Sequence, residues 1–130
     1  MKYCSISEAS AKFNIPESTI RYYEKKGLLP LIERDEAGRR LFSEDQMTLL
    51  EIVIYLKNTH MPISGIKQYV DWVVQGDDTL ELRLEMMKNH KRNVLAEISL
   101  MTESLKAIDV KINRYTGRIQ ERQEHNRMKK

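Results

Sequence analysis

The 130-residue sequence contains very little cysteine, proline, glycine or tryptophan. Its single cysteine, Cys4, cannot form a disulfide within the chain or build a thiolate metal site. Without a disulfide framework, the reducing cytoplasm is the natural compartment. The apolar stretches, such as 52–56, are far too short to cross a bilayer, and the N-terminus lacks the apolar run of a signal peptide. We therefore expect a cytoplasmic protein with no membrane contact.

Motifs for catalysis and metal binding are also missing. The sequence has no Gly-rich phosphate loop and no nucleophile motif. Its three histidines, His60, His90 and His125, are scattered, and no metal-ligand spacing links them. We expect that the protein is not an enzyme and that it uses no metal or cofactor.

Charged residues are abundant, at 32 % against 41 % hydrophobic residues. This balance is typical of a helical protein with a long charged helix rather than of a large enzyme core. The formal net charge is only +3, so any binding of phosphates needs cations that are clustered locally. Two clusters are present, one of Arg21, Lys25 and Lys26, the other of Arg34, Arg39 and Arg40.

The first thirty residues predict two short helices joined by a tight turn. Ser5 and Glu8 have the spacing of a capping box, which opens the first helix. Asn14 follows at a position where a left-handed residue is expected, and Pro16 can open the second helix. Gly27 closes that second helix. Two helices joined in this way form a helix-turn-helix.

The segment after residue 28 predicts a small hairpin with its turn at 35–38, followed by further helices. Ser43 and Gln46 have the spacing of a second capping box. Asp78 or Thr79 can cap the last helix. The two helices before that cap are expected at about 43–58 and 63–74.

From Leu80 the apolar residues alternate steps of four and three, which is a heptad seam with one polar interruption at Lys91. A helix of about 36 residues, roughly 54 Å long, cannot bury such a stripe alone. The residues expected at a dimer interface are Leu84, Met87, Val94, Ile98, Met101, Leu105, Ile108 and Ile112. From residue 117 the sequence has no apolar pattern and predicts a disordered polar tail.

The strings TIRYYEKKGLLP at 19–30 and GRRLF at 38–42 resemble the MerR family of bacterial transcriptional regulators. The resemblance covers essentially the whole chain, and it is most similar to a branch associated with aldehyde, electrophile or general stress responses. It implies an all-α fold with a small β wing. The implied divisions are a winged helix-turn-helix domain over 1–75, an antiparallel coiled-coil dimerisation helix over 76–116 and the tail over 117–130.

Regulators of this family are homodimers that bind a palindromic promoter and distort its overlong spacer so that RNA polymerase can use both contact elements. The resemblance therefore implies double-stranded promoter DNA and bacterial RNA polymerase as partners, together with a small-molecule effector. The glycine usual before the fourth helix is His60 here. An alternative function stays open, namely an architectural DNA-bending accessory protein without an effector. The long dimerising helix favours the regulator.

The residues expected to contact DNA lie on the second helix, the wing and the third helix. Arg21 can reach bases or phosphates, and Tyr22 can donate its hydroxyl to a phosphate. Tyr23 is expected to pack in the core, and Glu24 to orient a neighbouring arginine. The complete predicted set is Ser18, Thr19, Arg21, Tyr22, Lys25, Arg39, Arg40 and Lys57. A purely solvated helix face is the competing interpretation.

A group of aromatic residues lies between the reading head and the long helix in the sequence, formed by Tyr55, His60, Tyr69 and Trp72. Two interpretations of this group stay open, core packing and an effector pocket. Cys4 has only Lys2 as an obvious neighbouring cation, so we expect an unreactive thiol.

Overall fold

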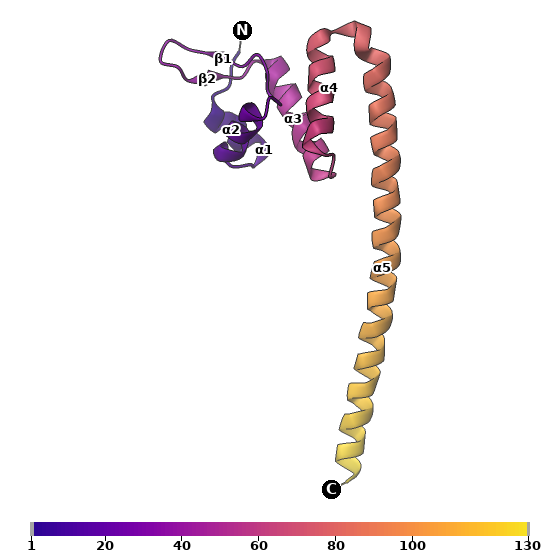
Figure 1. The fold of residues 1–130 in the computed structure, drawn as a ribbon. Coiled ribbons are helices and arrows are strands. Elements are labelled where there is room, and N and C mark those ends of the chain that lie inside the picture. The colour runs from indigo at the N-terminus through magenta and orange to yellow at the C-terminus, as the bar shows by residue number, and fades with distance from the viewer. Residues whose placement is uncertain (1, 130) are drawn as a thin grey trace. The chain divides into compact units, whose positions relative to one another are not determined.

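The computed structural model describes residues 2–129, and the chain divides into two compact units after Lys88. The fold is all-α with one two-stranded antiparallel sheet, as the sequence predicted (Figure 1). The elements, in chain order, are α1 (Ile6–Phe13), α2 (Glu17–Lys25), β1 (Glu33–Arg34), β2 (Arg40–Leu41), α3 (Glu44–Asn58), α4 (Ile63–Gln75), the 3₁₀ turn η1 (Asp77–Thr79) and α5 (Leu80–Met128).

The turn between α1 and α2 follows from the predicted signals. Both halves of the capping box are formed, because Glu8 N–H donates to the Ser5 hydroxyl and Ser5 N–H donates to the Glu8 carboxylate. Asn14 ends α1 in the left-handed conformation, with φ 53°. Pro16 stands at the N-cap of α2. The helix-turn-helix is therefore confirmed.

The ends of α2 and α3 also have a residue with positive φ. Gly27 follows α2 with φ 77°, and Leu28 N–H then donates to the Tyr23 carbonyl at 2.9 Å. His60 follows α3 with φ 70°, and Met61 N–H donates to the Leu56 carbonyl in the same way. This bond, reaching five residues back, is the usual helix end with a left-handed residue, where glycine is preferred. The local geometry thus explains why glycine is the expected residue at position 60.

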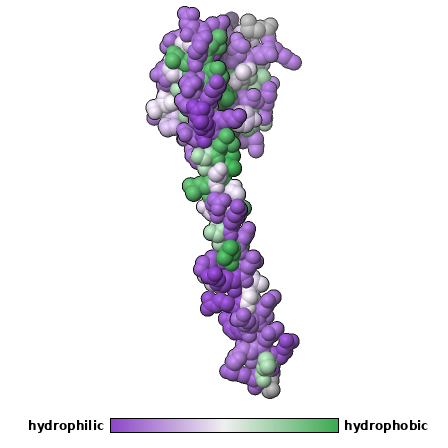
Figure 2. Space-filling model, turned by 90° about the vertical axis from the view of Figure 1, so that its right-hand side faces the viewer, coloured by the Kyte–Doolittle hydropathy of each residue, from purple (hydrophilic) through white to green (hydrophobic). Residues whose placement is uncertain are grey.

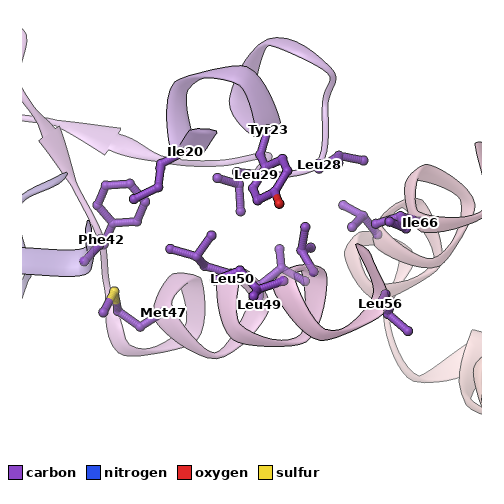
Figure 3. Close-up of a cluster of buried hydrophobic side chains, with 14 of the residues drawn as sticks. Ile20, Tyr23, Leu28, Leu29, Phe42, Met47, Leu49, Leu50, Leu56 and Ile66 are labelled. Atoms are coloured by element: carbon purple, nitrogen blue, oxygen red, sulfur yellow. The ribbon is translucent and has the colours of Figure 1, made fainter. Parts of the chain in front are cut away.

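The core of the first unit lies between α2, α3 and α4, with Phe42 at the end next to the sheet (Figure 3). Ile20 and Phe42 are fully buried, and Tyr23 is 5 % exposed, which confirms its predicted core position. Each large apolar side chain buried here contributes about 1.5–3 kcal/mol. The other fully buried large side chains are Leu28, Leu50, Val53, Ile66 and Val70. This packing fixes α2 and leaves its opposite face exposed.

The predicted caps at the starts of α3 and α5 are only partly correct. Ser43 accepts from Gln46 N–H, but the Gln46 Oε1 is buried without a hydrogen-bond partner, so the reciprocal half of the box is not formed. Thr79 does not cap α5. The oxygen of its buried hydroxyl lies 2.6 and 2.7 Å from the carbonyl oxygens of Trp72 and Gly76, so its one proton is shared between these two acceptors. The reason is that η1 folds the chain back onto the end of α4 before α5 begins.

The second unit is the remainder of α5, which is helical to Met128 and has no buried residues. The sequence predicted a disordered tail over 117–130, whereas in the structure α5 continues through residues 117–128. The tail has no proline and is rich in Arg, Glu and Gln, which are good helix formers. The missing apolar periodicity removes the sequence signal for packing against a partner, but it does not lower the tail's intrinsic tendency to form a helix. Ile119, four residues after Tyr115, also extends the apolar seam past its predicted end.

Candidate nucleic-acid interface

The exposed face of α2 carries a polar and cationic stripe. Ser18, Arg21, Tyr22 and Lys25 are all exposed and lie at positions i, i+3, i+4 and i+7, which places them on one side of the helix. Ile20 and Tyr23 occupy the buried side. The structure therefore brings together four of the residues predicted to contact DNA. Thr19 differs from them, because it is half-buried.

Neighbouring groups hold two side chains of this stripe. Arg21 forms an i,i+4 ion pair with Glu17 at 3.5 Å, and half of the Arg21 side chain remains exposed. The Lys26 ammonium lies 5.6 Å from the centre of the Tyr22 ring, within the range of a cation–π contact. Both contacts leave polar atoms on the solvent side, where they can meet phosphates.

The wing is the hairpin of β1 and β2, with its turn at 35–38 as predicted. Gly38 N–H donates to the Asp35 carbonyl at 2.9 Å, and Gly38 has φ 81°. The Asp35 carboxylate also accepts from the N–H groups of Ala37 and Arg39 and from Arg39 Nε. Hydrogen bonds from Arg39 are the main cause that lowers the pKa of Asp35 from its ordinary value of 3.8. The ionised carboxylate therefore shapes the turn.

The two predicted wing arginines have different environments. Arg39 leaves the turn with 80 % of its side chain exposed, so it can reach a phosphate. Arg40 is only 22 % exposed, because its Nε donates to Glu24 on α2 at 2.6 Å. That bond uses Nε, and the two terminal nitrogens keep their donors. The prediction that Glu24 orients a neighbouring arginine is thus confirmed.

Arg34 belongs to the same group, although it is not among the predicted DNA contacts. Its Nη2 donates to Glu24 at 3.3 Å, and its Nη1 donates to the Gly38 carbonyl at 2.9 Å. The useful signal was its place directly before the turn at 35–38, where a hairpin brings it opposite Arg40. Lys57 is exposed near the C-terminal end of α3 and does not belong to the α2 stripe.

Two of the four residues predicted to form one effector pocket, Tyr55 and Tyr69, line different cavities, and the shared pocket stays a prediction. Tyr69 lines a cavity of about 470 Å³ beside the N-terminal half of α3, together with Leu49, Ile52 and Val73. Tyr55 lines a different cavity of about 300 Å³ near the C-terminal half of α3. Each residue advances a helix by about 1.5 Å, so positions spread along α3 face different neighbours. His60 is exposed, and Trp72 is half-buried.

The second unit exposes large apolar side chains along α5. Ile98, Met101, Leu105, Ile108 and Ile112 are each more than half exposed, and they follow the predicted heptad seam. Figure 2 shows hydrophobic patches in green between hydrophilic ones along this helix. Met87, another predicted interface residue, packs partly against the core of the first unit.

A family model for MerR helix-turn-helix regulatory proteins matches residues 4–71, which include α1, α2, the wing and α3. The chain belongs to the MerR family. A helix-turn-helix transcriptional regulator from Haemophilus influenzae is 36 % identical to it over 109 residues, covering 84 % of this chain and 81 % of that protein.

Solved structures agree with this assignment. A MerR-family transcriptional regulator from Bacillus thuringiensis is 42 % identical to this chain, with a TM-score of 0.82. The match covers 87 % of this chain and 99 % of that regulator. HiNmlR, a MerR-family regulator that lacks the sensor domain and is bound to promoter DNA, is 34 % identical with a TM-score of 0.81. That match covers 88 % of this MerR-family chain and 91 % of HiNmlR.

Within residues 2–129, no helix is long and apolar enough to cross a membrane. The same residues contain no group of three or more His, Cys, Asp or Glu side chains placed to hold a metal ion.

Proposed function

We propose that the protein is a homodimeric transcription regulator that binds promoter DNA through the exposed face of α2 and the wing. The observation that carries this proposal is the single stripe of Ser18, Arg21, Tyr22 and Lys25 on a helix whose opposite side is fixed in the core. A helix of this kind fits the major groove, and cations on it contact phosphates and base edges. HiNmlR, which has the same fold, is bound to promoter DNA.

The dimer is proposed to form through α5. An apolar seam that is more than half exposed on an isolated helix is stabilised by a second copy of that helix. Two linked reading heads bind two half-sites, and a symmetric dimer requires a palindromic sequence. We further propose that the bound dimer distorts an overlong spacer between the two polymerase contact elements.

Selection from a random pool of duplexes by the wild-type protein supplies the DNA for the test. We expect an inverted repeat to be enriched; this selected DNA is called the enriched duplex below. The enriched duplex is then placed in the spacer of a promoter and transcribed in vitro with bacterial RNA polymerase. The protein should change transcription from an overlong spacer, and it should have a smaller effect once the spacer is shortened to the usual length.

Two results contradict parts of this proposal. Failure to enrich any sequence excludes sequence-specific reading. Tight binding to the enriched duplex with equal transcription from both spacers favours the alternative function, an architectural DNA-bending protein.

A further inference from the structure

We infer that Glu24 sets the sequence specificity of this protein by holding the wing in register with the reading helix α2, an inference that rests on the proposed DNA binding. Glu24 lies in the last turn of α2, and its side chain is 23 % exposed. One of its carboxylate oxygens accepts from Arg40 Nε at 2.6 Å, and both lie 3.3 Å from Arg34 Nη2. A single carboxylate therefore joins the helix to both strands of the wing.

The two arginines are direct neighbours across the hairpin. Arg34 in β1 is paired with Arg40 in β2. Like charges directly opposite each other destabilise an antiparallel pair. The Glu24 carboxylate offsets this repulsion, and charge-assisted hydrogen bonds of this kind are about twice as strong as neutral ones. The wing thus contains a charge conflict, and the carboxylate of Glu24 on α2 offsets it.

Apart from the bonds that Asp35 makes within its turn, the wing has little other support along its length. Each strand contains two residues, and an isolated two-stranded hairpin is at best marginally stable in water. Its remaining anchors lie at its base, where Cys4 and Phe42 exchange backbone hydrogen bonds of 2.9 and 2.8 Å. Tyr3 also bonds Glu33 there, which raises the Tyr3 pKa. The orientation of the outer wing against α2 therefore depends on Glu24.

The inference predicts the direction in which DNA affinity changes when Glu24 is lost, and this direction differs from that expected of simple charge repulsion. A carboxylate on a reading helix repels phosphates, so a Glu24 without a positioning role should weaken all DNA binding, and its removal should strengthen binding. Positioning predicts a different outcome. Loss of Glu24 should weaken binding to the enriched duplex, where wing and helix must meet their contacts together. Binding to a shuffled duplex, which depends on charge alone, should not weaken.

The test compares E24Q with E51Q, which removes the same charge from an exposed position on α3. Both are titrated against the enriched duplex and a shuffled duplex of equal composition, at one salt concentration. We expect E24Q to lose about tenfold or more in affinity for the enriched duplex, on the scale of a lost contact. Its affinity for the shuffled duplex should be equal or higher, and E51Q should match the wild type on both.

A double-mutant cycle tests the route through the arginines. In an R34M/R40M background, E24Q should cost much less than in the wild type, because its partners are gone. An equal cost in both backgrounds overturns the inference. The inference is also overturned if E24Q loses affinity equally for both duplexes, as a partly unfolded protein would. An affinity ratio between the enriched and the shuffled duplex that stays at the wild-type value has the same meaning. A wild-type protein that does not discriminate between the duplexes refutes the proposed function itself, which is a separate result.

Discussion

A charge placed in the apolar seam of α5 should separate the proposed dimer. Ile98 is 55 % exposed on the isolated helix, so burial by a partner removes about half of its apolar surface from water. Full burial of an isoleucine contributes about 1.5–3 kcal/mol, so Ile98→Glu loses about 1 kcal/mol in each protomer. Each glutamate must also be desolvated or protonated, at a cost of a few kcal/mol. With two copies per dimer, the total exceeds about 5 kcal/mol, or more than about a thousandfold in the dimer dissociation constant.

Sedimentation velocity over a range of protein concentrations measures this change. The matched control is Ala96→Glu, since Ala96 is exposed and lies on the side of α5 opposite the seam. We expect Ala96→Glu to remain a dimer and Ile98→Glu to sediment as a monomer at micromolar concentration. Equal dimerisation of the two variants would refute the assignment of the seam as the interface.

The remaining predictions concern the reading head, the wing and the thiol. Gly27→Ala should lower the free energy of unfolding by about 1–2 kcal/mol, because position 27 has φ 77°. Gly117→Ala, inside α5, should instead raise the free energy of unfolding by about 0.5–1 kcal/mol. Chemical denaturation measures both changes. The pKa of Asp35 is lowered in the folded protein, so its contribution to the wing is complete above pH 3.8 and is lost as the pH falls through the lower folded value. The protection factor of the Gly38 amide, which compares its exchange rate with that of an unfolded chain at the same pH, should therefore fall only under such acid conditions, and an unchanged protection factor would contradict this. Cys4→Ser should leave induction intact in a reporter assay, and abolished induction would identify the thiol as the sensor.

Local signals in the sequence were enough to predict most of the head. The Ser5 capping box, Asn14 and Gly27 each act through backbone geometry within a few residues, so their consequences do not depend on the rest of the fold. The sequence left the cap of α5 open between Asp78 and Thr79, and Thr79 does not take that role. Its hydroxyl could cap α5 or bond the end of α4, and only the packing of η1 decides between these partners.

The candidate interface was predictable where it lies on one helix. The spacing of Arg21, Tyr22 and Lys25 fixes their common face once α2 is known to be a helix. The sequence predicted that Glu24 orients an arginine but did not say which one, because Arg40 lies sixteen residues away and is brought near by the fold. The effector pocket stays a prediction for a related reason. Residues spaced along α3 and α4 share a pocket only if tertiary packing aligns them.

The affinity of Arg21→Ala for the enriched duplex, at one fixed salt concentration, tests most directly whether α2 reads DNA. The control is Arg118→Ala, which removes the same side chain from α5 in the second unit. We predict that Arg21→Ala stays folded and dimeric and binds about 1–3 kcal/mol more weakly than the wild type, while Arg118→Ala binds normally. An Arg21→Ala protein with wild-type affinity would contradict the account.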